Sequence, residues 1–109
     1  MATLFIKSLT CNETEDLTGS DECLLEVFTD DGRKPYRQDM NNGDVWDIND
    51  QFPFTTRAKI RLWDLDLGHW PDYHDLLGTA IIRVDPVVNA TATFTQDGAD
   101  YELTYDVLV

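Results

Sequence analysis

Hydrophobic and polar residues alternate along this chain in short runs. The clearest run is RAKIRLW (57–63), in which three apolar residues alternate with the basic residues Arg57, Lys59 and Arg61. A second is YELTYDV (101–107), where Tyr101 and every second residue after it are apolar or aromatic. A period of two residues is typical of a strand with one face buried and the other exposed. The pattern therefore predicts antiparallel strands with an apolar inner face.

Shorter apolar and β-branched runs extend this prediction along the chain. Between them, Gly follows Asp or Asn in the segments 30–34, 41–44 and 96–100, which is the residue chemistry of hairpin turns. No segment shows a long 3.6-residue apolar period. We therefore predict an all-β fold, an eight-stranded antiparallel β-sandwich forming one domain over 1–109. The predicted strands are 2–9, 23–28, 34–38, 45–48, 57–63, 79–84, 90–95 and 101–107.

Composition agrees with a folded domain but does not indicate a compartment. Hydrophobic residues make up 42% of the 109 residues, as in globular proteins. No apolar run approaches the roughly 18 residues of a membrane-spanning helix, and no basic-then-apolar leader opens the sequence. Extracellular and cytoplasmic locations therefore both stay open.

Charge changes the picture more. The chain has 21 acidic and 8 basic residues, a net charge of −13. Binding to nucleic acid requires a basic surface, so this balance argues against a nucleic-acid partner. Nine of the acids lie within the two short segments 11–23 and 64–77. Such clustering favours a bound cation over an evenly acidic surface.

The two acidic segments are expected to be loops at one end of the sandwich. The loop 11–23 follows the first predicted strand, and the loop 62–78 connects the strand 57–63 to the next one. Carboxylates that converge from two loops repel one another unless a cation lies between them. Ca²⁺ prefers about six to eight oxygen ligands, including carboxylates and backbone carbonyls. We therefore predict one or more Ca²⁺ ions between the loops, with candidate ligands Glu15, Asp16, Asp21, Asp64, Asp66, Asp72 and Asp75.

These two segments resemble the calcium loops of the C2 domain, the calcium-dependent lipid-binding module of protein kinase C and synaptotagmin. In the first loop Glu15, Gly19, Ser20 and Asp21 match the family pattern, and in the second Asp64, Asp66 and the run Asp75-Leu76-Leu77-Gly78 match. The second loop is longer than is usual, and Glu22 and Cys23 stand where the family has Pro and an aromatic residue. The resemblance is thus to a distant or bacterial-style relative. It implies an eight-stranded sandwich and calcium binding.

The tip of the second loop, 67–73, carries Leu67, Trp70 and Tyr73. These side chains either fold back over the loop or contact a partner, since Trp and Tyr are favoured at interfaces. If they contact a partner, the resemblance implies calcium-dependent binding to a phospholipid membrane through this tip. A second alternative is a carbohydrate-binding or adhesive accessory domain with a structural calcium, in which Trp70, Tyr73 and Trp46 would stack on sugars.

The basic row formed by Arg57, Lys59 and Arg61 also has two interpretations. The C2 resemblance implies contact with anionic lipid headgroups. The other interpretation is that the row pairs with acids on neighbouring strands.

Two further features bear on chemistry. Cys11 and Cys23 flank the first acidic loop, so they form either a disulfide that closes it or two reduced core residues. No nucleophile motif accompanies Ser20 or the histidines, and the acids are too alike to take opposed catalytic roles. We therefore predict no catalytic residues and a binding protein rather than an enzyme.

Overall fold

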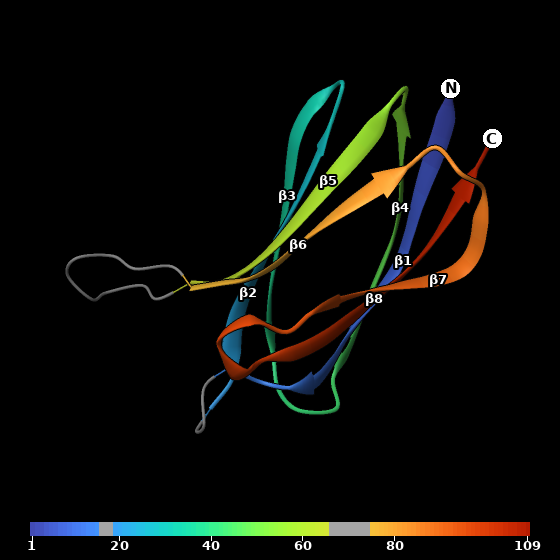
Figure 1. The fold of residues 1–109 in the computed structure, drawn as a ribbon. Helices are drawn as coiled ribbons and strands as arrows, with labels where there is room; N and C mark the ends of the chain where they lie inside the picture. The colour runs from blue at the N-terminus through green and yellow to red at the C-terminus, as the bar shows by residue number, and fades with distance from the viewer. Residues whose placement is uncertain (16–18, 66–74) are drawn as a thin grey trace.

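The computed structural model describes residues 1–15, 19–65 and 75–109. Two four-stranded antiparallel sheets pack face to face (Figure 1), which confirms the predicted β-sandwich. A short 3₁₀ helix, η1 (Gln96–Gly98), is part of the connection between the last two strands. The strands are β1 (Ala2–Glu13), β2 (Asp21–Thr29), β3 (Gly32–Met40), β4 (Val45–Phe54), β5 (Arg57–Asp64), β6 (Asp75–Arg83), β7 (Val87–Phe94) and β8 (Asp100–Leu108).

The strand order places four connections at one end of the molecule. One sheet has the order β4-β1-β8-β7 and the other the order β3-β2-β5-β6. Because all the pairings are antiparallel, the connections β1–β2, β3–β4, β5–β6 and β7–β8 emerge at the same end. The chain termini lie beside each other on β1 and β8 at the opposite end (Figure 1). Both acidic segments are therefore brought to the end away from the termini.

The alternating pattern places side chains as predicted. On β5, Ala58, Ile60 and Leu62 are fully buried between the sheets, and the residues between them face outward. On β8, Tyr101 and Leu103 are fully buried. Most of the buried hydrophobic side chains form one core cluster, and burial of this apolar surface drives folding.

The strands extend further into the acidic segments than predicted. β1 continues to Glu13 and β2 begins at Asp21, so the first connection is 14–20 rather than 11–23. β5 continues to Asp64 and β6 begins at Asp75, so the second connection is 65–74 rather than 62–78. Backbone ladder bonds form here regardless of side-chain charge. The acids at these strand ends are consequently held by the rigid sheets.

β4 is also longer than the predicted strand 45–48. Asp50 stands at an inward-facing position, opposite Ile6 on β1, and interrupts the apolar pattern. Its carboxylate accepts hydrogen bonds from Tyr36 Oη and, at 2.7 Å, from Lys34 Nζ. These bonds, first that from Lys34, hold the pKa of Asp50 below its usual value. The acid is therefore tolerated between β3 and β4, and the strand continues to Phe54.

A close contact between the sheets requires glycine at residue 78, the last residue of the Asp75-Leu76-Leu77-Gly78 run. Gly78 on β6 lies against Phe94 on β7, and a Cβ at residue 78 would stand 3.0 Å from the Phe94 Cα and 2.8 Å from a ring carbon. Real Cβ atoms rarely approach a backbone atom this closely. Glycine at this position therefore permits the approach of the two sheets.

Within the described residues, no helix has the length and apolarity that crossing a membrane would require.

Candidate metal centre

Three acidic side chains meet at the loop end of the sandwich. Glu15 follows β1, Asp64 ends β5 and Asp75 begins β6. One carboxylate oxygen of each lies within 4.8 Å of the others. Two oxygens that bind the same Ca²⁺ at about 2.4 Å are at most ~4.8 Å apart, so one ion could contact all three.

The centre of this group is an acidic pair across a strand ladder. Asp64 and Asp75 are direct partners in the β5–β6 register. Asp64 is 5% exposed, although carboxylates are seldom buried. Its Oδ1 accepts a hydrogen bond from the backbone N–H of Glu22 at 3.0 Å, and Leu65 N–H donates to the Glu22 carbonyl at 2.8 Å. These bonds fix the end of β5 to the start of β2.

Asp21 links the first loop to this group from inside the core. It is fully buried. Its Oδ2 accepts a hydrogen bond from the backbone N–H of Glu15 at 2.8 Å and another from Tyr101 Oη at 2.6 Å. The side chain therefore sets the backbone position of Glu15, which carries one of the three clustered carboxylates.

Below Asp21, Tyr101 lies near two buried thiols. Cys23 Sγ donates a weak hydrogen bond to Tyr101 Oη at 3.4 Å. Burial raises the pKa of Cys23 to about 12 and raises that of Cys11 as well. Burial, and next its hydrogen bond to Asp21, raises the pKa of Tyr101. The phenol therefore stays protonated and keeps donating to Asp21. Cys11 and Cys23 are free thiols, so of the two interpretations the structure has the reduced core residues.

A third connection, between β3 and β4, supports the first. Asn42 Oδ1 accepts a hydrogen bond from Thr14 N–H at 2.8 Å, next to Glu15. Gly43 N–H donates to the Cys11 carbonyl at 2.7 Å, and Cys11 N–H donates to the Asp44 carbonyl at 2.8 Å. The sequence predicts only a turn at 41–44. The signal for its contact with the first connection is Asn42 just before Gly43, because an Asn side chain in a turn readily accepts hydrogen bonds from backbone N–H groups.

The described residues thus bring together three of the seven predicted ligands, Glu15, Asp64 and Asp75. Asp21 is placed beside them as the residue that orients Glu15. The other three predicted ligands, and the predicted partner contacts at the loop tip, lie outside the described residues. These are Asp16, Asp66 and Asp72, and Leu67, Trp70 and Tyr73.

Trp46, the described member of the predicted sugar-stacking set, is half-buried on β4. Its ring packs edge-on against Tyr36, with ring centroids 6.4 Å apart. A ring held in this way presents less of its surface to a ligand than a fully exposed platform.

The donor set restricts the kind of metal. All three clustered groups are carboxylates, which are hard oxygen donors. Ca²⁺ and Mg²⁺ favour such oxygens, whereas structural Zn²⁺ sites favour Cys and His. Cys11 and Cys23 do not belong to the clustered group. The described residues therefore fit a hard divalent cation.

Comparison with known proteins gives the fold. No protein-family profile and no curated protein matches the chain. Among solved structures, a C2 domain matches over the whole of both chains with a TM-score of 0.66 and 16% identity. The C2A domain of a plant extended synaptotagmin matches with a TM-score of 0.61 and 12% identity, over 98% of this chain and 91% of that one. Human group IVD cytosolic phospholipase A2 matches with a TM-score of 0.63 and 14% identity.

The match to the human phospholipase covers 98% of this chain but 17% of the enzyme. Together these neighbours confirm the predicted resemblance: the chain has a distant C2-like fold.

Proposed function

We propose that this chain is a calcium-binding module, rather than an enzyme, in which Glu15, Asp64 and Asp75 hold the ion. One observation carries the proposal: carboxylate oxygens from three separate segments lie within 4.8 Å of one another at one end of a C2-like sandwich. Backbone carbonyls and water would complete the coordination of the ion.

The network around the site supports a preformed centre. Asp64 is oriented by Glu22 N–H, and Glu15 is oriented by Asp21. Ordered ligands lose less conformational freedom when an ion binds, which favours affinity. The same ligands repel one another when the ion is absent.

Calcium is preferred to magnesium for a physical reason. Mg²⁺ demands nearly ideal octahedral geometry at about 2.0–2.1 Å and usually keeps several waters. A site that takes its ligands from two strand ends and from the β1–β2 connection suits the more flexible coordination of Ca²⁺.

The test is thermal unfolding with and without calcium. An ion that binds only the folded state stabilises it, by about 2.7 kcal/mol at a free concentration 100 times the Kd. We expect EGTA to lower the melting temperature and millimolar Ca²⁺ to raise it, with the difference lost in Asp64→Asn. Identical melting curves in both conditions would refute the proposal.

Two roles are candidates for the bound ion: recruitment to a membrane, or a structural role in a domain that binds protein or glycan. Sedimentation with phosphatidylserine vesicles, with and without Ca²⁺, separates them. Pelleting that needs Ca²⁺ and is lost in Trp70→Ala would favour membrane binding through the tip 67–73. No pelleting would favour a structural ion in a protein- or glycan-binding domain. The net charge of −13, which opposes approach to an anionic membrane, favours the second outcome.

A further inference from the structure

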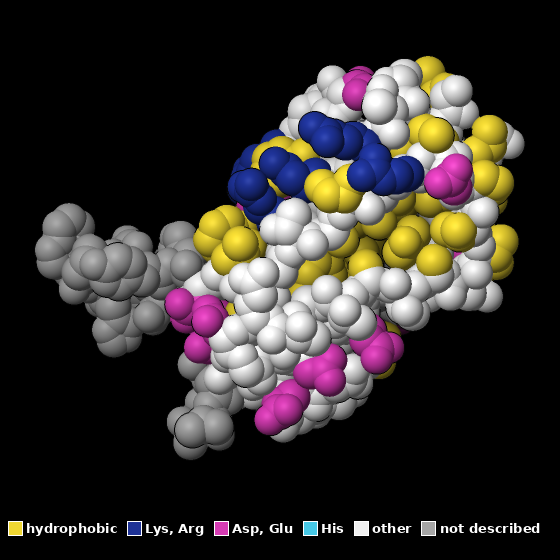
Figure 2. All heavy atoms as spheres, viewed as in Figure 1, with side chains coloured by type: hydrophobic (Ala, Val, Ile, Leu, Met, Phe, Trp, Pro, Cys, Tyr) yellow, Lys and Arg dark blue, Asp and Glu magenta, His cyan; other side chains and the backbone are white. Residues whose placement is uncertain are grey.

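The outer surface of the sheet β3-β2-β5-β6 carries a cluster of cations. Arg57, Lys59 and Arg61 extend along β5, and Arg83 on β6 lies directly opposite Arg57 in the register. We call these four residues the basic face. Figure 2 shows Lys and Arg side chains gathered in one region of the surface, with hydrophobic side chains between them. This is half of the eight basic residues of a strongly acidic chain.

The basic face forms no salt bridge among the described residues. The salt bridges in the described part of the chain involve Lys7, Arg33 and Lys34, and none involves the basic face. The interpretation that the row pairs with acids on neighbouring strands therefore holds in this part of the chain only for Arg61, which stands directly opposite Glu26 on β2 but forms no salt bridge with it. Like charges directly opposite on a ladder are destabilising, so the juxtaposition of Arg57 and Arg83 has a cost in stability.

Two carboxylates beside the basic face are already engaged. Glu26 is the register partner of Arg61, but it accepts hydrogen bonds from Arg33 Nε and, at 2.6 Å, from Trp63 Nε1. Arg61 Nε is buried and lacks a hydrogen-bond partner among the described residues. Asp30, at the edge of the face, accepts from Thr55 N–H at 2.8 Å and Thr55 Oγ1 at 2.6 Å. The charges of the basic face are thus available to a ligand.

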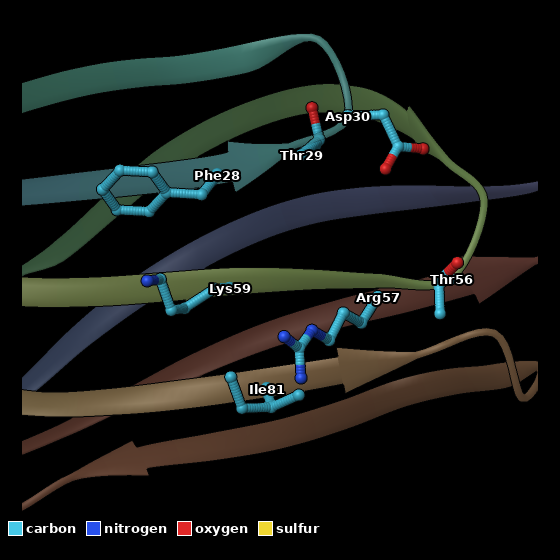
Figure 3. A pocket seen from close by; sticks show the side chains of 7 residues that line it. All are labelled: Phe28, Thr29, Asp30, Thr56, Arg57, Lys59 and Ile81. Atoms are coloured by element: carbon cyan, nitrogen blue, oxygen red, sulfur yellow. The ribbon is translucent and has the colours of Figure 1, made fainter.

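A pocket lies within the basic face. It has a volume of about 370 Å³, and its lining combines two apolar side chains with polar and charged ones: Phe28, Ile81, Thr29, Asp30, Thr56, Arg57 and Lys59. Figure 3 shows these side chains on one surface of the sheet, with Phe28 and Ile81 on the strands flanking Lys59. Lys59 Nζ lies 4.8 Å from the centre of the Phe28 ring, and Arg61 Cζ lies 5.8 Å from it. Apolar neighbours exclude water and strengthen ion pairs formed beside them.

The spacing of the basic side chains along β5 indicates the kind of ligand that they can bind. Alternate residues on a strand are about 6.6–6.8 Å apart, so Arg57, Lys59 and Arg61 repeat at the distance that separates alternate residues of any extended peptide. We propose that the basic face binds an extended acidic peptide segment of a partner protein, whose alternate carboxylates pair with this row. The occupant is identified by charge complementarity and by this repeat.

Net charge favours a peptide over a membrane. An anionic bilayer is a wide surface and is exposed to the whole molecule, which carries −13. A peptide of a few residues interacts mainly with the local cations, because charges beyond about 8 Å are screened at physiological ionic strength. A short acidic segment therefore experiences attraction where an extended anionic surface experiences net repulsion.

The test uses two labelled peptides of identical composition. TETETET places its three acids on one side of an extended chain, whereas TEEETTT divides them between two sides. We expect fluorescence anisotropy to show TETETET binding at least tenfold more tightly, with affinity falling as salt rises. Each titration is run in both EGTA and Ca²⁺, because the proposal does not depend on the metal centre.

Matched double variants test the location. Arg57→Gln with Lys59→Gln should weaken TETETET at least tenfold, whereas Lys7→Gln with Lys34→Gln removes the same charge elsewhere and should leave binding within twofold. Circular dichroism confirms folding of both. Equal binding of the two peptides, or equal loss in both double variants, would overturn the proposal. A third outcome would identify a membrane, rather than a peptide, as the ligand. In it the chain does not bind TETETET but pellets with phosphatidylserine vesicles in EGTA, and the pelleting is lost in Arg57→Gln with Lys59→Gln.

Discussion

Asp64 and Asp75 lie directly opposite each other at the end of the β5–β6 ladder, and one oxygen of each belongs to the same cluster with Glu15. Opposed like charges destabilise a strand pair. Asp64 is in addition buried, which makes its charge more costly. The arrangement is favourable when a cation lies between the carboxylates, and this is the physical basis of the proposed function.

Neutralising one member of the pair should have opposite effects with and without calcium. In EGTA, Asp75→Asn should raise the free energy of unfolding by about 0.5–1 kcal/mol, because it removes the repulsion. In millimolar Ca²⁺ it should be less stable than the unmodified chain, because a ligand is lost. Urea unfolding in the two conditions measures both values.

The control is Asp85→Asn, which removes the same charge from an exposed residue at the opposite end of the sandwich. Its effect should have the same sign and size in EGTA and in Ca²⁺. A reversal in sign for Asp85→Asn, or none for Asp75→Asn, would contradict the account.

The hydroxyl of Tyr101 is predicted to act on the metal centre through Asp21. Tyr101→Phe removes the 2.6 Å bond to Asp21 Oδ2 and should cost about 1–3 kcal/mol, because a fully buried carboxylate loses a donor. Since Asp21 positions Glu15, calcium affinity should also fall. Tyr105→Phe, whose hydroxyl makes no hydrogen bond among the described residues, is the control. Calcium titration and chemical unfolding of both variants check this, and unchanged affinity in Tyr101→Phe would exclude the coupling.

Gly78 is predicted to be required for packing rather than for backbone flexibility. Gly78→Ala should destabilise the fold by about 1–3 kcal/mol, because its Cβ would stand 2.8 Å from a ring carbon of Phe94 and 3.0 Å from the Phe94 Cα. This is a decrease in melting temperature of several degrees for a domain of this size. Thr79→Ala, at the exposed neighbouring position, should change it little. Equal melting temperatures for the two variants would show that the sheets separate freely here.

The buried thiol of Cys23 should make stability fall at alkaline pH. Its pKa is 9.0 when unperturbed and about 12 in the folded chain, where burial disfavours the thiolate. The neutral thiol therefore contributes stability that is complete below pH 9 and is lost progressively as pH rises from 9 toward 12. Urea unfolding at intervals between pH 8 and pH 10.5 should show a steeper loss in the unmodified chain than in Cys23→Ala. Parallel slopes would count against this assignment.

The sandwich could be predicted from sequence because its signal is local. Alternation at 57–63 requires one buried face, and every apolar residue it predicted inward is buried. Strand ends were less accurate, because ladder bonds continue through acidic residues such as Asp75 that carry no apolar signal. The strand predicted at 45–48 was shorter than β4 for a related reason. Asp50 interrupts the apolar pattern, and the side chains that bind it, Lys34 and Tyr36, lie on another strand.

The candidate site was predictable in composition but not in its internal roles. Motif spacing indicated Glu15, Asp64 and Asp75, and the structure brings them together. Motif spacing could not distinguish Asp21 from these ligands, because the role of Asp21 depends on Tyr101, a residue 80 positions away in the chain. Asn42 was missed for the same reason, because its contact with Thr14 arises only when the β1–β2 and β3–β4 connections meet.

Isothermal titration calorimetry with Ca²⁺ tests the central claim most directly. The calcium-stripped chain should release or absorb heat and saturate with at least one ion per chain, whereas a variant combining Asp64→Asn and Asp75→Asn should give only the heat of dilution. The proposal would be contradicted by a folded, calcium-stripped chain that shows no saturable heat, or by a double variant that binds as tightly as the unmodified chain.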